Sequence, residues 1–163
     1  TDLPLNAHLM MTGPARYAPA FIERGVCQIF FHIEAVDDPH RVIDVIQEHG
    51  AEAAIALKPK TPASTVACCI DDITAVMAMT VEPGFSGQSF MEEGCHKIPA
   101  IREMAPHIDV YVDGGVNAET AKTVVRYGAN AIVAASAVFD HGEGDVVENV
   151  KTLRAAAEAA WTN

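Results

Sequence analysis

Short apolar runs alternate with longer, more polar segments along the chain, and the connections between them are short and polar. The apolar runs are the length of strands, while the longer segments are typical of helices. Regular alternation of strand and helix predicts a parallel sheet with helices between its strands. The predicted strands cover 4–10, 26–32, 53–57, 74–79, 108–112 and 130–134, and the predicted helices cover 15–24, 39–49, 62–70, 91–104, 118–127 and 144–160.

Glycine and proline support these boundaries. Gly25, Gly50 and Gly128 each come just after a predicted helix, where a glycine commonly ends the last turn. Pro39 and Pro62 come where a first helical turn tolerates a missing N–H. Neither a long linker nor a low-complexity segment interrupts the pattern, so residues 1–163 are predicted to form a single domain.

A glycine-rich loop follows the fourth predicted strand, in the segment 81–90. Gly84 and Gly87 are three residues apart, so backbone N–H groups can turn toward one point and hold an anion. No Lys or Arg occurs between Lys60 and Lys97, so such an anion would be bound by backbone dipoles. The alternative interpretation is an ordinary connection from strand to helix.

A second glycine-rich loop begins with a carboxylate. Asp113 follows the strand 108–112, and the pair Gly114 and Gly115 leads to a helix predicted to begin at Ala118. This arrangement combines a candidate proton-transfer group with a candidate anion site. Asp113 could otherwise be a turn-forming residue or a helix cap. Both loops follow the carboxyl ends of strands, where parallel α/β proteins bind ligands.

Composition narrows the class of protein. Half of the 163 residues are hydrophobic, which suffices for one core. The formal net charge of -11 argues against nucleic acid or an anionic membrane surface as a partner. Apolar runs are too short for a transmembrane helix or a signal peptide, so we expect a cytoplasmic protein. Four cysteines without C-x-x-C spacing are expected to be reduced thiols.

Several short motifs occur in order along the chain. They are Ala7-His8-Leu9-Met10, Phe31-His32-Ile33-Glu34-Ala35, Lys58-Pro59-Lys60-Thr61, the run from Met79 to Phe90, Val112-Asp113-Gly114-Gly115-Val116 and Ala135-Ser136-Ala137-Val138-Phe139. Together they resemble the motifs of the ribulose-phosphate 3-epimerase family. The resemblance implies a TIM barrel that interconverts D-ribulose 5-phosphate and D-xylulose 5-phosphate in the pentose phosphate pathway.

The resemblance also implies that the chain is incomplete relative to the family fold. A TIM barrel has eight strands, whereas six are predicted here. By resemblance these are the third to eighth, so the first two βα units are expected to be missing from this chain. Six strands leave open sheet edges, which favours association, for instance as a homo-oligomer.

Catalytic residues follow from the same resemblance. The family uses two aspartates as acid–base groups, and these aspartates bind a divalent metal ion together with two histidines. His8 matches one metal ligand, and Asp113 matches one aspartate that is both catalytic and metal-binding. The family's second-strand His-x-Asp-x-Met-Asp motif does not occur in the sequence, so the choice among Zn, Fe, Mn and Co stays open. Met10 and Met79 match residues that line the site, and His32 and Glu34 are interpreted as structural or supporting residues.

The substrate implied by the resemblance is a small sugar phosphate, whose phosphate group the family binds through three loops. One departure from the family pattern is Ala135, where glycine is usual and where a methyl group could crowd the phosphate. The matching residues are Gly84, Phe85, Ser86, Gly87, Gly114, Gly115, Ala135 and Ser136.

Two alternatives remain at this point. The chain could be an epimerase for a ketohexose 6-phosphate such as allulose 6-phosphate, or a truncated relative that binds a sugar phosphate without turnover. A decarboxylase of the same barrel group is disfavoured, because the sequence has no Asp-x-Lys-x-x-Asp motif.

Overall fold

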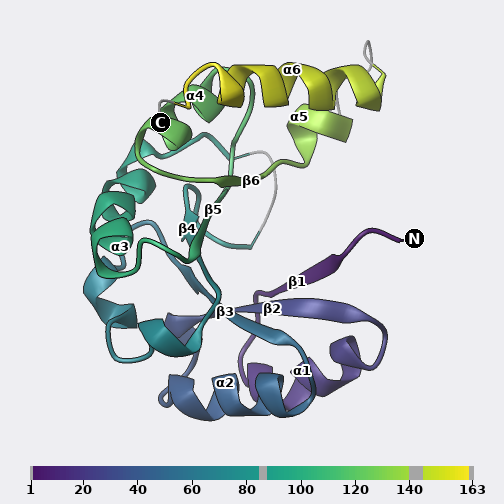
Figure 1. Ribbon diagram of the computed structural model, residues 1–163, viewed down its shortest axis with the longest axis vertical. Helices are drawn as coiled ribbons and strands as arrows, with labels where there is room; N and C mark the ends of the chain where they lie inside the picture. The colour runs from purple at the N-terminus through teal and green to yellow at the C-terminus, as the bar shows by residue number, and fades with distance from the viewer. Residues whose placement is uncertain (1, 85–87, 140–144, 162–163) are drawn as a thin grey trace.

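The computed structural model describes residues 2–84, 88–139 and 145–161 (Figure 1). Six β-strands alternate with α-helices and short 3₁₀ helices. The strands are β1 (Leu5–Leu9), β2 (Val26–His32), β3 (Glu52–Leu57), β4 (Ala75–Met79), β5 (Asp109–Asp113) and β6 (Ala131–Val133). The α-helices are α1 (Pro14–Ile22), α2 (Pro39–Glu48), α3 (Ile98–Met104), α4 (Thr120–Arg126), α5 (Ser136–Phe139) and α6 (Val146–Glu158), and the 3₁₀ helices are η1 (Ile33–Ala35), η2 (Ala63–Val66), η3 (Ile70–Asp72) and η4 (Glu92–Lys97).

The strands form one parallel sheet in the order in which they occur along the chain. Because crossovers between parallel strands are right-handed, this order places successive connections on the same face of the sheet. A doubly wound fold would instead reverse its strand order. The sheet curves with the helices on its outer side, as in part of a TIM barrel (Figure 1). The prediction of a parallel α/β fold is therefore confirmed.

Alternation along the strands produces two apolar layers. Ile29, Phe31 and Ile55 belong to the large cluster between sheet and helices. Phe30 and Met77 belong to a smaller cluster on the inner face. Both faces of the central strands are thus buried, as expected of a parallel sheet that helices cover on its outer side and that curves around an apolar inner side.

The helix predicted over 62–70 is wrong. This segment forms the 3₁₀ helix η2, followed by turns and η3. Its backbone bonds span three residues, as from Thr65 N–H to Pro62 O and from Cys69 N–H to Val66 O. The Thr65 hydroxyl also donates to Pro62 O at 2.8 Å, a local bond that competes with helical pairing.

Two other helical predictions needed correction. The helix predicted over 91–104 is η4 followed by α3, and the change of geometry precedes Pro99. A proline in the helix interior would lack its N–H bond and clash with the preceding turn, so one continuous α-helix is disfavoured. The short helix α5 was not predicted, because the segment 136–139 is only four residues long.

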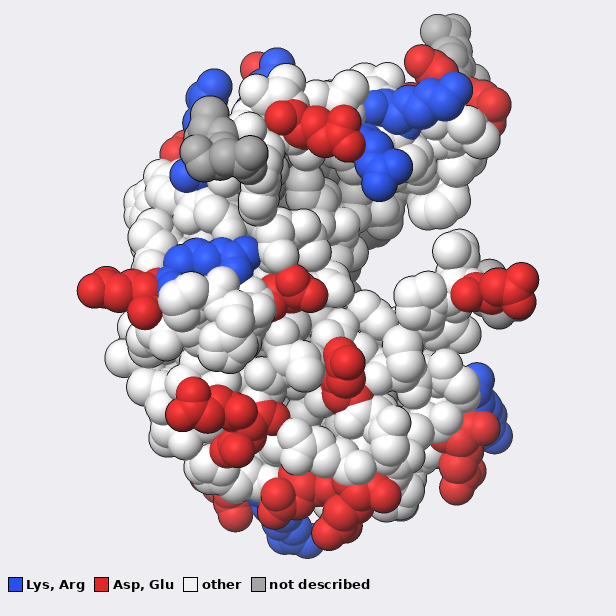
Figure 2. Space-filling model, in the orientation of Figure 1, with Lys and Arg blue, Asp and Glu red and all other residues white. Residues whose placement is uncertain are grey.

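The first and last strands of the described sheet, β1 and β6, form its edges. A hollow separates the region of β1 from α5 and α6, visible at the right of the space-filling view (Figure 2). No helix in the described part of the chain is long and apolar enough to cross a membrane. Large apolar side chains exposed on the molecule include Leu3, Leu5, Met10, Phe139, Val146, Val147 and Val150.

Candidate active site

The predicted catalytic and metal-binding side chains meet at the carboxyl ends of the strands. His8 is in β1, and Asp113 is the last residue of β5. These strands are far apart in the sheet order, yet His8 Nδ1 lies 3.4 Å from Asp113 Oδ2. The sheet curves, so that β1 and β5 face each other across its inner side (Figure 1), and this curvature allows the contact. The structure thus places the two predicted residues side by side.

Two further residues extend this pair into a connected row. His32 ends β2, and its Nε2 lies 2.9 Å from His8 Nε2. The other ring nitrogen, His32 Nδ1, lies 3.3 Å from Glu34 Oε2. His32 is only 4 % exposed. His32 and Glu34 also line a second pocket. Asp113, His8, His32 and Glu34 therefore form a continuous row of side-chain contacts that ends at this pocket.

Glu34 is held by several donors. Its Oε1 accepts the Lys58 N–H at 2.8 Å and also a hydrogen bond from the Thr61 hydroxyl. Burial by itself raises the pKa of Glu34, but the bonds from His32, Thr61 and Lys58 outweigh it and lower the pKa to about 2. The carboxylate is therefore ionised at neutral pH. Thr61 was not singled out as a functional residue from the sequence, and its place in a matched motif was the available signal.

Thr80 joins the loops that follow β4 and β5. It is fully buried, its N–H donates to Asp113 O at 2.8 Å, and its hydroxyl lies 2.6 Å from Gly114 O. A Cβ on Gly114 would lie 2.5 Å from the Val81 side chain, and φ at Gly114 is +120°. A side chain at this position would therefore clash and strain the backbone. Sequence reasoning missed Thr80 as a residue that positions Asp113.

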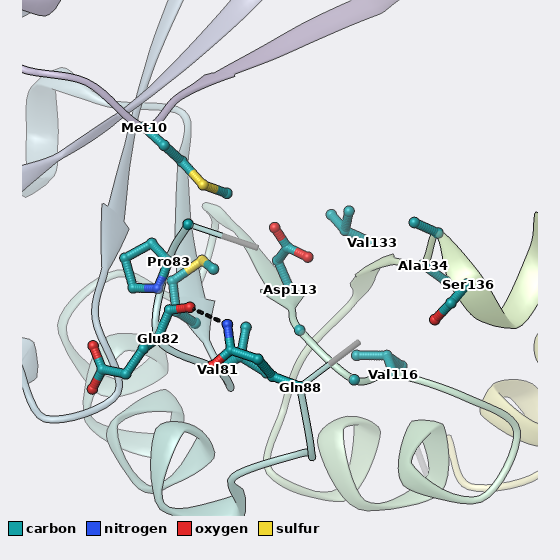
Figure 3. A pocket seen from close by; sticks show the side chains of 15 residues that line it. Met10, Val81, Glu82, Pro83, Gln88, Asp113, Val116, Val133, Ala134 and Ser136 are labelled. Carbon is teal, nitrogen blue, oxygen red and sulfur yellow. Dashed lines mark hydrogen bonds between the residues drawn. The ribbon is translucent and has the colours of Figure 1, made fainter. Parts of the chain in front are cut away.

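A cavity of about 290 Å³ opens beside Asp113 (Figure 3). The Asp113 carboxylate points into it, and Met10 lies across from it. Glu82 also lines the cavity, but its carboxylate points away from Asp113 in Figure 3. The described lining residues are Met10, Met79, Val81, Glu82, Pro83, Gly84, Gln88, Asp113, Gly114, Gly115, Val116, Val133, Ala134, Ala135 and Ser136.

The predicted phosphate-binding residues that the structure describes line this same cavity. They come from the loops after β4, β5 and β6, and the cavity lining contains no Lys or Arg among the described residues. Ala135 does not have a positive φ, so its methyl group causes no backbone strain. Phe85, Ser86 and Gly87 lie outside the described residues.

The family resemblance predicts His8 and Asp113 as metal ligands. Within the ranges that the structure describes, no group of three or more His, Cys, Asp or Glu side chains could hold a metal ion. His8 and Asp113 nevertheless offer a nitrogen and an oxygen 3.4 Å apart. Two ligands at about 2.1 Å from one ion are separated by a distance of this order. The pair therefore fits part of a coordination shell.

The cysteines do not contribute to this arrangement. All four are free, and Cys69 and Cys95 are buried, whereas Cys27 and Cys68 are exposed. Burial is the main reason that the pKa of Cys69 and the pKa of Cys95 are each raised to about 12. The buried thiols are thus protonated and unreactive.

Comparison with known proteins decides the family. The model of the ribulose-phosphate 3-epimerase family matches residues 1–139. The chain belongs to this family. It is 42 % identical over 159 residues to ribulose-phosphate 3-epimerase of Bacillus subtilis, covering 94 % of this chain and 72 % of that protein. It is 43 % identical over 161 residues to the enzyme of the same name from Methanocaldococcus jannaschii, covering 96 % of this chain and 67 % of that protein.

Solved structures support the fold. KGPDC from Streptococcus mutans, determined as a complex, has a TM-score of 0.78 over 99 % of this chain and 75 % of its own, at 14 % identity. At this low identity the likeness concerns the fold alone. Membership of the epimerase family makes this chain an epimerase, an isomerase in class.

Proposed function

We propose that this protein interconverts D-ribulose 5-phosphate and D-xylulose 5-phosphate by moving a proton at C3. The observation that carries the proposal is the Asp113 carboxylate, which points into a cavity lined by glycine-rich loops and contacts His8. The names of the relatives with 42 % and 43 % identity support this substrate pair.

Asp113 would act as one of the two acid–base groups. A proton on the carbon beside a ketone becomes acidic when the negative charge on the neighbouring oxygen is stabilised. Asp113 would accept this proton on one face of the carbon or return one to it. The second group, for the opposite face, would correspond to the aspartate of the family motif that is absent from this sequence.

Binding would depend on backbone groups and apolar walls. Gly114, Gly115 and Ser136, with Gly84, line the cavity that would receive the phosphate, and their N–H groups would supply donors to it. Met10 and Met79 would exclude water from the reacting carbons. Neither feature distinguishes a five-carbon from a six-carbon sugar phosphate. Activity on ribulose 5-phosphate should therefore be compared with activity on a ketohexose 6-phosphate.

His8 and Asp113 would contribute ligands to a divalent cation, whether Zn, Fe, Mn or Co. Such an ion would stabilise negative charge that develops on the substrate oxygen. In the same proposal the six βα units are the third to eighth of the family barrel, since the chain spans 67 to 72 % of the two relatives. Further ligands would then come from the units that complete the barrel.

An epimerase assay with matched variants tests the proposal. We expect conversion of ribulose 5-phosphate in the presence of divalent metal, and a decrease in kcat of about 10²- to 10⁴-fold in Asp113→Asn. Asp109→Asn is the control, because Asp109 is on the same strand but at its opposite, exposed end. Preference for a hexulose phosphate, or equal activity of the two variants, would contradict the proposal.

A further inference from the structure

The row of four side chains from Glu34 to Asp113 restricts where the ring protons of its two histidines can be. Each neutral imidazole has one N–H donor and one acceptor nitrogen, and its neighbours decide which is which. The donors around Glu34 are fixed, so the order of the protons can be followed from Glu34 toward the cavity.

Glu34 is surrounded by donors. Lys58 N–H and the Thr61 hydroxyl bond to Oε1, while Oε2 faces His32 Nδ1 at 3.3 Å. A carboxylate that already receives two donors is an acceptor toward the third group. His32 therefore carries its proton on Nδ1, and its Nε2 is left with a lone pair.

When both rings are neutral, only one arrangement of protons fits the contact between the two histidines. Their Nε2 atoms are 2.9 Å apart, whereas the ring centroids are 4.9 Å apart and the rings are tilted by 24°. The rings thus meet by their nitrogen-bearing edges, in the geometry of an N–H···N hydrogen bond. Because His32 Nε2 is the acceptor, His8 must donate from its own Nε2.

In a neutral His8 ring this leaves Nδ1 without a proton, facing Asp113 Oδ2 at 3.4 Å. Two acceptors at this distance repel each other unless a cation or a proton lies between them. We propose that Glu34 and His32 are positioning residues that fix His8 in its Nε2–H form, so that its bare Nδ1 faces Asp113 and can bind a divalent cation together with it. The ligand role of His8 rests on the proposed function, whereas the order of protons follows from the contacts described above.

The proposal predicts an inversion of this order in Glu34→Gln. In this variant the Lys58 N–H and the Thr61 hydroxyl would still donate to the side-chain oxygen, which is now part of an amide. The NH₂ group of that amide would then face His32 Nδ1. His32 would then carry its proton on Nε2 and donate to His8 Nε2. His8 would be protonated on Nδ1 instead, directly opposite Asp113, where it could no longer bind a cation.

Long-range ¹H–¹⁵N NMR correlations identify the protonated ring nitrogen, at a pH where free imidazole is neutral. We expect His8 as Nε2–H and His32 as Nδ1–H in the metal-free wild-type protein, and both reversed in Glu34→Gln. Glu48→Gln, an exchange of the same kind at an exposed position, should leave both unchanged. A proton on His8 Nδ1 in the wild type, in a neutral or a doubly protonated ring, would overturn the proposal, and so would the absence of a reversal in a folded Glu34→Gln variant.

Affinity for Co²⁺ alone, measured by competition with a chromophoric chelator, gives a second readout. We expect a 10- to 100-fold weaker affinity in Glu34→Gln, the usual effect of losing a residue that orients a metal ligand. His32→Phe should weaken Co²⁺ binding to a similar extent. The measurement can therefore still be made with one of the two variants if the other does not fold. Wild-type affinity in either folded variant contradicts the positioning role. If the NMR spectra show the expected proton order but the protein has no epimerase activity, the proposed function is wrong and the positioning role of Glu34 and His32 stands.

Discussion

Glu34 shows how neighbouring groups decide the state of a single residue. It is partly buried, which alone would favour the neutral acid, yet it accepts hydrogen bonds from Lys58, Thr61 and His32. The pKa of Glu34 is lowered from 4.5 to about 2 because these bonds are made to the charged form. The low pKa of Glu34 is therefore a property of the folded protein, because these hydrogen bonds are lost on unfolding.

This lowered pKa makes stability depend on pH. Because the pKa is lower in the folded state, the ionised carboxylate stabilises the fold above the unfolded value of 4.5, and this stabilisation is lost as the pH falls toward about 2. After allowance for solvent screening, we expect Glu34→Gln to reduce the free energy of unfolding by about 1–2 kcal/mol at neutral pH.

Denaturant titrations of both proteins at several pH values test this prediction. The difference between wild type and Glu34→Gln should be constant above about pH 5.5 and shrink between pH 4.5 and 2. A difference that does not change with pH would show that the carboxylate charge contributes nothing.

At the scale of elements, the loops after β4 and β5 are held to each other by buried backbone contacts. Thr80 bonds to Asp113 O and Gly114 O, and Gly115 packs against the backbone of Phe90. The position of the Asp113 backbone thus depends on a residue from the preceding strand's loop. The geometry around Asp113 is therefore set by two elements together.

Replacing Thr80 with Val keeps the shape of the side chain and removes its hydroxyl. We expect Thr80→Val to lower the free energy of unfolding by about 1–3 kcal/mol, because carbonyl groups of Asp113 and Gly114 lose a buried donor. Epimerase activity should fall as well, since Asp113 is less firmly positioned. Thr152→Val, on the exposed side of α6, is the control for both measurements.

Lys97 connects the β3 loop to η4 in a similar way. Its ammonium group is buried and donates to the carbonyls of Lys58, Pro59 and Gly94 at 3.1, 2.7 and 3.2 Å. Burial is the main cause that lowers the pKa of Lys97. This contact fixes the loop whose Lys58 N–H holds Glu34.

We therefore expect Lys97→Met to lower the free energy of unfolding by about 1–3 kcal/mol, because it leaves buried carbonyl groups without their donor. Lys122→Met, at an exposed position on α4, should have little effect. Thermal unfolding followed by circular dichroism measures both. Equal midpoints for the two variants would show that the Lys97 contacts do not stabilise the fold.

For the whole molecule, the exposed edges β1 and β6 are the main physical consequence of six parallel strands. Unpaired edges offer N–H and C=O groups to another strand. Exposed apolar side chains are found near both edges, for example Leu3, Leu5 and Phe139. Their burial by further strands or by another chain would stabilise the fold.

We predict that the 163-residue chain, produced by itself, associates with further copies. Light scattering after size-exclusion chromatography should give a mass above 17.4 kDa that falls on dilution. Substitution of Leu5 by Lys, a charge on an edge strand, should shift the equilibrium toward the monomer. A mass of 17.4 kDa at all concentrations would contradict this prediction.

Sequence patterns alone determined the strands and their succession along the chain. The apolar runs are short and bounded by glycine or polar residues, and each strand of the structure lies within about one residue of its predicted range. The same reasoning failed at 62–70, where local Thr65 bonding and short connections favour 3₁₀ geometry. The periodicity of apolar residues reports the average environment of a segment, and it contains no information on individual hydrogen bonds made by side chains.

The sequence by itself also identified Asp113 and the glycine loops as candidates from their residue types at strand ends, and it identified His8 through the resemblance of its motif to the family. It could not place His8 beside Asp113, since the two are 105 positions apart and belong to distant strands of the sheet. Only the curvature of the sheet brings them together. The row from Asp113 to Glu34 and the buried hydroxyl of Thr80 likewise exist only in three dimensions, because hydrogen bonds depend on distances that sequence separation does not fix.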